Sequence, residues 1–475
     1  MEAGLPARLH RAPSAAPAGI VHLGLGAFFR AHGAIFVDEA MQASGGDWGI
    51  IGVSLQSPGT RDKLRPQGWA YTALELGPNG ETPQVVTVLR DVLVAPEDPQ
   101  AVLDAMAAPS VRIVSLTVTE KGYCHEPSTG RLNVGHPDIQ HDLDSPLPRS
   151  APGFLARALA ARKAAGLPPF TVLCCDNLPE NGRVVCGVVL DLARLIDPAL
   201  ADWIAAEGAF PSSMVDRIVP ATTAADLDRL EAASGLRDEA PVMHEPFRQW
   251  VIEDDFIGGE RPDLGAVGVQ LVADVTPYEH MKLRMLNGTH SSLAYLGYLG
   301  GHETIADTVA DPVFARFAGR LWRNEIIPAL TPPPGEDLAA YADALAARYA
   351  NPAIRHRTWQ IAMDGSQKLP QRILGTIAEG RAAGRPVPGL TLAVAAWMRY
   401  TSGRDEAGKP IDVKDPLAAQ LAALWRDDPA ETVAGFLGLS QVFPAALRED
   451  AGFAADLTVA LTRLVGGGAR AAADA

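Results

Sequence analysis

The sequence predicts an α/β protein: a parallel sheet with alternating helices, followed by a second, mainly α-helical domain. Up to about residue 275, short apolar runs alternate with Ala-rich helical stretches, which is typical of a parallel sheet. Beyond Thr276 the sequence shows only long helical periods. The 475 residues also exceed what one hydrophobic core normally serves. We therefore expect one domain over 1–275, with 1–18 as a frayed leader, and another over 276–475.

The first domain opens with a strand, a helix and a second strand. Residues 19–26 form an apolar run that ends in glycines, residues 27–43 have helical spacing, and residues 48–55 are rich in Ile and Val. Two β-rich stretches within 69–89 flank Gly77-Pro78-Asn79-Gly80, a strong turn signal. This pattern predicts an inserted hairpin.

The alternation continues along the rest of the first domain. Strand-like runs at 111–118 and 170–175 are separated by helical stretches such as 151–165. Further extended pieces lie at 214–219, 247–252 and 267–275. In the helical second domain, Thr331-Pro332-Pro333-Pro334-Gly335 and residues 384–389 interrupt the helices, and the low-complexity tail 466–475 predicts a frayed end.

The charge balance limits the classes of partner. There are 56 acidic against 41 basic residues, and the net charge of −15 repels phosphate, so we expect no nucleic-acid and no membrane partner. Apolar runs such as 293–299 end well short of the roughly 20 residues of a membrane span. The start lacks the apolar block of a secretory signal, so the cytoplasm is the expected location.

The cysteines predict neither a zinc site nor a redox site. No two of them have CxxC spacing, and the expectation is reduced, buried thiols and no metal. They are Cys124, Cys174, Cys175 and Cys186.

A glycine motif lies where the first apolar run meets the first helix. In Gly24-Leu25-Gly26-Ala27-Phe28-Phe29, the glycines allow a tight turn against a pyrophosphate, and the helix start presents free N–H groups. However, Phe29 stands where the fingerprint wants Gly or Ala, and the next strand ends in Ser54-Leu55-Gln56 without a ribose-binding acid. The motif alone fits a dinucleotide site and a plain strand-to-helix turn about equally.

A second motif, Lys282-Leu283-Arg284-Met285-Leu286-Asn287-Gly288-Thr289-His290, opens a helix that continues through Tyr298. At about 100° per residue, Asn287 lies about 140° and His290 about 80° round from Lys282, so one side holds all three. Apolar neighbours imply burial, which lowers the pKa of a lysine toward that of a working base. Such a lysine accepts a hydroxyl proton while amides stabilise the alkoxide. Asn287-Gly288 is also a turn dipeptide, and a lone histidine is more often a core residue.

Two further loops follow strands. The loop Cys175-Asp176-Asn177-Leu178-Pro179-Glu180-Asn181-Gly182 lies at the end where α/β folds bind ligands, and Asn177 is a candidate second amide. It also fits an Asx-type loop that caps the helix after Glu180. Residues 117–123 line a cofactor cleft or simply turn, and their spacing leaves both possibilities open.

Several segments together resemble the mannitol dehydrogenase family of long-chain polyol dehydrogenases. They are GLGAFFRAH at 24–32, SLTVTEKGY at 115–123, CDNLPENG at 175–182, MVDRIVP at 214–220 and KLRMLNGTH at 282–290. Two more, EPFRQWVIED at 245–254 and HRTWQIAMDGSQKLPQR at 356–372, are most similar to the D-mannonate oxidoreductase branch, whose members are also called fructuronate reductases. The family usually has histidine where this chain has Phe29.

The resemblance implies a Rossmann-type dinucleotide-binding domain, a mainly helical substrate-binding domain, NAD as cofactor and no catalytic metal. It implies that Lys282 is the general acid/base, that Asn177 and Asn287 polarise the reacting oxygen, and that His290 orients the substrate. The cofactor residues by this resemblance are Gly24, Leu25, Gly26, Ala27, Phe28, Phe29, Arg30 and Thr117, and the substrate residues are Asp216, Arg357, Lys368 and Arg372.

On this resemblance we expect an enzyme that interconverts D-mannonate and D-fructuronate with NAD(H). Arg357, Lys368 and Arg372, which cluster with Trp359 in the sequence, are the candidates for a cationic clamp on the carboxylate. The alternatives are a mannitol 2-dehydrogenase, a tagaturonate reductase-like enzyme acting on another polyol or sugar acid, and a dinucleotide-binding protein without turnover. NADP is a second possibility for the cofactor, because Arg61 could bind a 2′-phosphate. The sequence does not indicate the oligomeric state.

Overall fold

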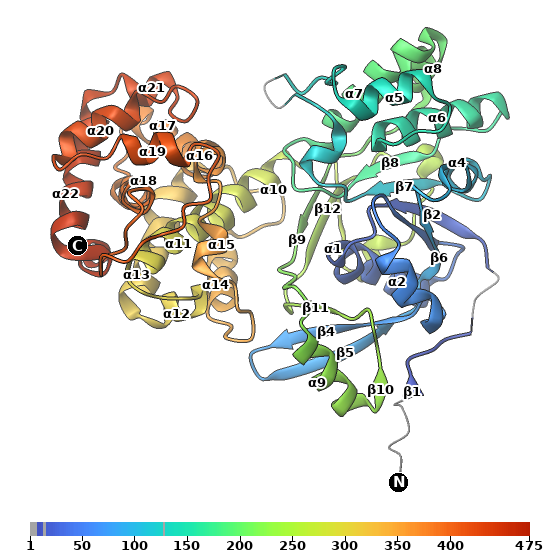
Figure 1. The fold of residues 1–475 in the computed structure, drawn as a ribbon, viewed down its shortest axis with the longest axis horizontal. Helices are drawn as coiled ribbons and strands as arrows, with labels where there is room; N and C mark the ends of the chain where they lie inside the picture. The colour runs from blue at the N-terminus through green and yellow to red at the C-terminus, as the bar shows by residue number, and fades with distance from the viewer. Residues whose placement is uncertain (1–6, 13–15, 127–128) are drawn as a thin grey trace. The chain divides into compact units, whose positions relative to one another are not determined.

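The computed structural model describes residues 7–12, 16–126 and 129–475, and the chain divides into two compact units, Met1–Thr276 and Pro277–Ala475. The first unit is built on a five-stranded parallel sheet (Figure 1), as the sequence predicts. In spatial order its strands are β6 (Leu89–Val94), β3 (Gly49–Ser54), β2 (Ala18–Leu23), β7 (Ile113–Leu116) and β8 (Thr171–Cys174).

The strand order of this sheet reverses between β2 and β7. From β2 the chain moves to β3 and β6 on one side, and it later returns to place β7 and β8 on the other side. In open α/β sheets, ligands bind outside the carboxyl ends of the strands at such a switch point. The glycine motif follows β2 and Thr117 follows β7, so both lie there.

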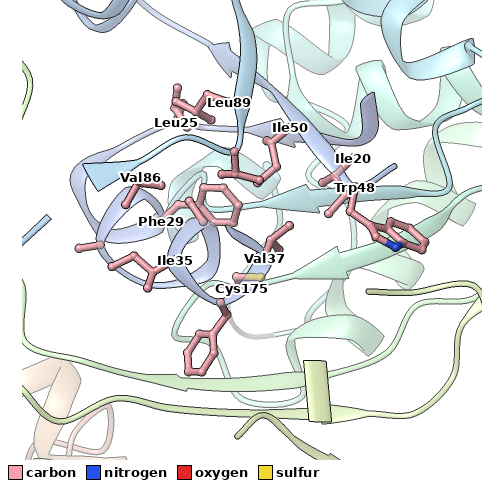
Figure 2. Close-up of a cluster of buried hydrophobic side chains, with 14 of the residues drawn as sticks. Ile20, Leu25, Phe29, Ile35, Val37, Trp48, Ile50, Val86, Leu89 and Cys175 are labelled. Atoms are coloured by element: carbon pink, nitrogen blue, oxygen red, sulfur yellow. The ribbon is translucent and has the colours of Figure 1, made fainter. Parts of the chain in front are cut away.

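Alternate residues of β2 enter two different cores. Val21 and Leu23 join a cluster formed with helices α4 (Pro99–Ala107), α6 (Ala151–Ala164) and α7 (Asn181–Ile196). Ile20 points the other way, into a cluster with α1 (Ala27–Ala31) and α2 (Gly33–Ser44), shown in Figure 2. Because successive side chains of a strand face opposite sides, the sheet carries helices on both faces.

The helix predicted over 27–43 is two helices. His32 separates α1 from α2 with φ −133° and ψ −89°, outside the helical region. Its Nε2 lies 2.9 Å from the carbonyl oxygen of Gln249, a contact from a distant part of the chain that local sequence spacing cannot indicate.

Smaller sheets complete the first unit. They are β11 (Val242–His244), β4 (Tyr71–Gly77) and β5 (Gly80–Val86); β13 (Gln270–Val272), β12 (Gln249–Glu253) and β9 (Ser213–Asp216); and β1 (Ala7–Arg8) with β10 (Leu236–Arg237). The antiparallel pair of β4 and β5 is the predicted hairpin. The remaining helices of the unit are α3 (Gly59–Leu64), α5 (Pro137–Asp144), α8 (Pro198–Glu207) and α9 (Ala224–Ser234).

The prediction of a frayed leader is wrong for residues 7–12. Leu9 is buried, β1 pairs with β10, and the Arg11 guanidinium donates to the carbonyls of Thr87 and Leu89. Long-range pairing therefore anchors this segment, which composition alone does not reveal. Residues 1–6 and 13–15 of the predicted leader lie outside the described residues.

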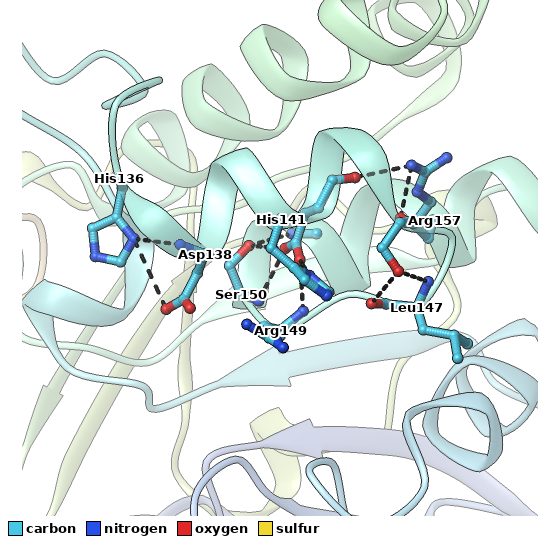
Figure 3. A network of polar contacts seen from close by, with 10 residues as sticks. His136, Asp138, His141, Leu147, Arg149, Ser150 and Arg157 are labelled. Carbon is cyan, nitrogen blue, oxygen red and sulfur yellow. Dashed lines mark hydrogen bonds and ion pairs between the residues drawn. The ribbon is translucent and has the colours of Figure 1, made fainter.

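A buried carboxylate fixes the connection between α5 and α6 (Figure 3). Asp142 is completely buried and accepts hydrogen bonds from the Arg149 N–H (2.7 Å), the Ser150 N–H (3.0 Å) and the Ser150 hydroxyl (2.6 Å). A β-carbon at Gly153 would lie 2.0 Å from its Oδ2, so glycine is required there. Helix α6 packs against α7, which follows the loop after β8.

The second unit contains helices and, among its described residues, no named strand, as predicted. They are α10 (Thr276–Met281), α11 (Thr289–Leu299), α12 (Ile305–Ala310), α13 (Pro312–Arg320), α14 (Leu338–Tyr349), α15 (Thr358–Ile361), α16 (Gly365–Leu369), α17 (Gly375–Ala382), α18 (Pro388–Thr401), α19 (Ala418–Ala423), α20 (Pro429–Leu437), α21 (Ala445–Arg448) and α22 (Ala451–Asp474). Helix α18 is buried along most of its length and packs against α11 and α22.

The prediction of a frayed tail over 466–475 is wrong. Helix α22 bends at Gly468 (φ 80°, ψ 168°) and its last residues return to the body of the unit. Arg470 pairs with Asp311 at 2.6 Å, and Arg316 pairs with Asp474 at 2.7 Å. In this low-complexity tail, small side chains such as Ala469 and Ala473 are fully buried.

Candidate functional site

The turn after β2 requires its first glycine. Gly24 has φ +90°, and a β-carbon there would lie 2.2 Å from the carbonyl oxygen of Thr117. The N–H groups of Gly24 and Leu25 both donate to the Val53 carbonyl, at 2.9 and 3.1 Å. The turn is thus fixed against both neighbouring strands, at the switch point of the sheet.

The second glycine faces open space. Gly26 is exposed, and a β-carbon there would meet only the Gly24 carbonyl, at 3.8 Å. Among the described residues, the N–H groups of Ala27, Phe28 and Phe29 have no protein acceptor, because they form the first turn of α1. An open approach beside free N–H donors suits a pyrophosphate.

The side chains of Phe29 and Arg30 lie in the interior. Phe29 stacks on the buried His22 ring, with ring centroids 3.3 Å apart and an interplanar angle of 7°. Arg30 is buried, donates to the Ala240 carbonyl at 2.6 Å and lies over the Tyr71 ring. Both were predicted to bind the cofactor. The Arg30 N–H donates to the Gly26 carbonyl, so of these two residues only Phe29 has a backbone N–H that a ligand can accept from.

Sequence reasoning missed the role of Asp176. Its carboxylate accepts the N–H groups of Val118 (2.8 Å) and Thr119 (3.0 Å) and the Tyr123 hydroxyl. Thr119 has φ +66° and ψ 163°, a strained region that non-glycine residues rarely adopt, and Asp176 holds it there. Burial raises the pKa of Asp176, and these hydrogen bonds partly oppose the shift. The loops after β7 and β8 are therefore joined.

The predicted Asn177 is exposed in the loop after β8. The Glu180 side chain does not cap α7. Instead Asn181 ties the loop to β9 through bonds to Asp176 and Ser213. Asp216, the predicted substrate residue of this unit, is buried at the end of β9.

In the second unit, Lys282 and Asn287 lie on a π-helical segment, η5 (Lys282–Gly288), rather than on an α-helix. The i→i+5 ladder fits more residues into a turn, so five residues complete about one turn. The predicted angle of about 140° is therefore too large, and Asn287 lies on nearly the same face as Lys282. Lys282 is buried and Asn287 is half-buried.

The alternative that Asn287-Gly288 forms a turn is also wrong. Gly288 has helical φ and ψ (−64° and −51°), and a β-carbon there would lie 2.7 Å from the carbonyl oxygen of Arg372. The glycine lets η5 approach a second π-helical segment, η8 (Pro370–Leu374).

A third π-helical segment, η6 (Leu321–Ile326), also contacts η5. The Trp322 indole donates to the Met285 carbonyl at 2.9 Å, and the Tyr349 hydroxyl donates to the Leu286 carbonyl at 2.8 Å. Side chains thus satisfy carbonyls of η5. Single π-helical turns occur frequently at functional sites.

His290 is not a hydrogen-bonded core residue. It is buried, its ring stacks on Tyr349 (5.3 Å) and meets His356 edge-on (4.6 Å), yet its Nε2 has no hydrogen-bond partner in the part of the chain that is described. Burial lowers the pKa of His290 well below its usual value, so the ring is neutral. The unpartnered Nε2 can therefore form a hydrogen bond with a ligand.

Three cationic groups and a second histidine lie close enough to lower the pKa of His290 further. The cations are Arg372, Arg348 and Lys368, and the histidine is His356, whose own pKa burial lowers to about 4. Arg372 donates to the Ser291 hydroxyl at 3.1 Å, and Lys368 donates to the Met363 carbonyl at 2.6 Å. Burial lowers the pKa of both cations. Three cations therefore act on His290, and Asp364 and Asp415 act on one of them, Lys368.

Lys368 and Arg372 thus act on His290, whereas the third clamp candidate does not. Arg357 is exposed, lies 3.7 Å from Glu303 and is not among the charges that shift the His290 pKa. Trp359 is 36% exposed. Sequence reasoning missed Arg348. This residue lies on α14, outside every sequence motif that pointed to the site.

The four cysteines are free. In residues 7–12, 16–126 and 129–475 no group of three or more His, Cys, Asp or Glu side chains could hold a metal ion. Over the same residues, no helix has both the length and the apolar character that crossing a membrane requires.

Comparison with known families matches both units. The Mannitol dehydrogenase Rossmann domain matches residues 18–265, and the Mannitol dehydrogenase C-terminal domain matches residues 274–465. The predicted fold class, a Rossmann-type domain with a second, mainly helical domain, is thereby confirmed.

Named relatives cover nearly the whole chain. D-mannonate oxidoreductase of Escherichia coli (strain K12) is 48% identical over 457 residues, which is 95% of this chain and 94% of that protein. Mannitol 2-dehydrogenase of Aspergillus terreus is 42% identical, over 94% of this chain and 91% of that protein. The structure of Pseudomonas fluorescens mannitol 2-dehydrogenase in a ternary complex with NAD and D-mannitol is similar with a TM-score of 0.85 and 39% identity, covering 98% of this chain and 96% of that one.

Proposed function

The chain belongs to the mannitol dehydrogenase family of oxidoreductases, and we propose that it interconverts D-mannonate and D-fructuronate with NAD(H). One observation carries the choice of a sugar acid: the unpartnered Nε2 of His290 lies among the positive charges of Arg348, Lys368 and Arg372. The 48% identity with D-mannonate oxidoreductase of Escherichia coli supports the same choice.

A carboxylate substrate would suit Arg372 best. Burial is the largest effect on the pKa of Arg372, and the groups that oppose it are the tyrosines Tyr295 and Tyr349, whereas Asp364 and Asp415 already act on Lys368. The carboxylate of a hexonate would pair with Arg372 and extend toward Lys368, while neutral His290 would orient a hydroxyl. Mannitol and fructose offer no such charge.

The glycine turn is the proposed NAD site. The open approach at Gly26 and the free N–H groups of Ala27 to Phe29 fit a pyrophosphate. When bound, the nicotinamide supplies or accepts a hydride. Arg61, the candidate for a 2′-phosphate, pairs with Glu97 and Asp62, so its charge is already balanced. This pairing favours NAD over NADP.

The proposed acid/base is Lys282. Its amine would take the proton from the substrate hydroxyl during oxidation and return it during reduction. Asn287, on nearly the same face of η5, would donate its amide N–H to the reacting oxygen, and Asn177 would be the second amide. The substrate is a small molecule, and we propose the cytoplasm as the site of the reaction.

The test follows NADH absorbance with fructuronate, tagaturonate and fructose at equal concentrations, and repeats the assay with NADPH. The proposal expects fructuronate and NADH to give the highest kcat/KM. Activity confined to fructose would instead support the second candidate, a mannitol 2-dehydrogenase, which the similarity to the Pseudomonas fluorescens enzyme favours. NADH binding without turnover of any of the three would indicate a protein that has lost catalysis.

A variant pair tests the carboxylate contact directly. Replacing Arg372 by Gln should raise KM for fructuronate by about tenfold, the loss expected for one charge-assisted hydrogen bond. Arg355→Gln is the matched control, because Arg355 is exposed and pairs only loosely with Glu303, at 3.5 Å. An equal effect of both variants would refute the assignment.

A further inference from the structure

We infer that His22 is a positioning residue for the glycine turn, acting through the Thr117 hydroxyl on the carbonyl of Gly24, with Phe29 holding the His22 ring in place. The inference rests on the proposed dinucleotide site, because it concerns how that site is kept in shape. His22 lies inside β2, one strand residue before the turn begins.

A continuous chain of hydrogen bonds joins the core to the turn. His22 Nδ1 lies 2.8 Å from the Ser115 hydroxyl, and His22 Nε2 lies 2.8 Å from the Thr117 hydroxyl. The Thr117 hydroxyl in turn donates to the Gly24 carbonyl at 2.8 Å. Both partners come from β7 and its end, the strand beside β2 at the switch point.

The direction of every bond in this chain follows from counting protons. The single hydrogen of the Thr117 hydroxyl goes to Gly24, so this hydroxyl accepts from His22, and Nε2 carries the proton. Complete burial lowers the pKa of His22 to about 3, so the ring is neutral and its Nδ1 accepts from Ser115. Each group has one compatible role, and no other tautomer satisfies the chain.

The Gly24 carbonyl is the atom that this chain controls. It also accepts the N–H of Gly26 at 2.6 Å, so this oxygen has one donor from within the turn and one from the end of β7. Fixing it orients the peptide units that follow. As a result, the free N–H groups of Ala27, Phe28 and Phe29 stay in place for an anionic ligand.

Phe29 completes the arrangement from the other side of the turn. Its ring lies flat on the imidazole at 3.3 Å, and a β-carbon at Gly33 would lie 2.6 Å from the Phe29 ring. The Phe29 ring is therefore packed from both sides. This gives the residue that departs from the family pattern a role that does not involve touching the cofactor.

The test measures NADH affinity by fluorescence titration of the full chain without substrate, so it does not depend on turnover. Thr117→Val removes the hydroxyl with almost no change in shape, and His22→Phe removes both bonds of the imidazole. We expect each to raise the Kd for NADH by about 3- to 10-fold, the effect of losing one or two hydrogen bonds.

Thr117→Ser keeps the hydroxyl and should restore most of the affinity. The matched control is Thr376→Val, since Thr376 is buried in the second unit and its hydroxyl has no partner among the described residues. Wild-type Kd values in both Thr117→Val and His22→Phe would overturn the inference, as would equal losses in Thr117→Val and Thr117→Ser. If the unmodified chain failed to bind NADH, the proposed function itself would fall.

Discussion

Two alanine substitutions, two positions apart, should separate a glycine that the fold requires from a glycine that the ligand requires. At Gly24, φ is +90°, a conformation that costs an L-residue about 1–2 kcal/mol. The new β-carbon would lie 2.2 Å from a backbone oxygen of Thr117, and the forced shift adds about 1–3 kcal/mol. Gly24→Ala should therefore lose about 2–5 kcal/mol in the free energy of unfolding, which lowers the thermal midpoint of the first unit by roughly 3–9 °C.

Gly26→Ala should behave in the opposite way. Its φ of −90° and ψ of −177° suit any residue, and its β-carbon would enter open space, so we expect a stability change within about 0.5 kcal/mol. That space is where the pyrophosphate is proposed to approach, so the Kd for NADH should rise by tenfold or more. Calorimetry and fluorescence titration on both variants provide the measurements. Unchanged NADH affinity in a well-folded Gly26→Ala would refute the proposed site, and an unchanged midpoint in Gly24→Ala would refute the steric reasoning.

Three further outcomes are expected. Replacing Lys282 by Ala should lower kcat by about 10² to 10⁴, the usual loss for a general acid or base, and turnover equal to that of the unmodified chain would remove Lys282 from the mechanism. Glu97→Gln should release Arg61 and lower KM for NADPH but not for NADH, which steady-state kinetics with the two cofactors would detect. Burial lowers the pKa of His22 to about 3 and that of His290 well below normal, so the unfolded chain binds more protons than the folded one below about pH 6.5. The thermal midpoint should therefore fall as the pH drops from about 6.5 toward 3, whereas a midpoint that stays constant between pH 7 and 4 would contradict these shifts.

The sheet and most helices could be predicted because their patterns are local. The apolar runs that became β2, β3 and β7 are continuous, as strands buried on both faces require. The hairpin of β4 and β5 followed from the turn residues between them. Errors arose where a distant contact decides the local structure, as with Arg11 in the leader, His32 between α1 and α2, and Arg470 in the tail.

The candidate site shows the same limit more sharply. Motifs identified Lys282, Asn287 and His290 because they lie close together in the sequence. The positive charge of Arg348 and the loop contacts of Asp176 come from elements that the fold brings close, and no spacing signals them. The one available clue to Asp176 was its position directly after a buried strand, where α/β proteins place functional side chains.

The π-helical segment explains why an α-helical wheel gave the wrong angle. The number of residues per turn determines which residues share a helix face. That number in turn depends on which donors form hydrogen bonds with the backbone carbonyls. In η5, Trp322 and Tyr349 donate to the carbonyls of Met285 and Leu286. Those donors come from η6 and α14, so tertiary contacts support the change from an α-helix to a π-helix. The change moves Asn287 onto the face of Lys282.

The net charge of −15 and the three cations near His290 act over different ranges. At physiological ionic strength, exposed charges more than about 8 Å apart are largely screened, while buried groups are screened much less. The acidic surface therefore disfavours large polyanions, which must cover many charges at once. A single carboxylate that reaches Lys368 and Arg372 interacts mainly with those buried cations. An acidic protein is thus compatible with an anionic substrate, provided that the substrate is small enough to enter.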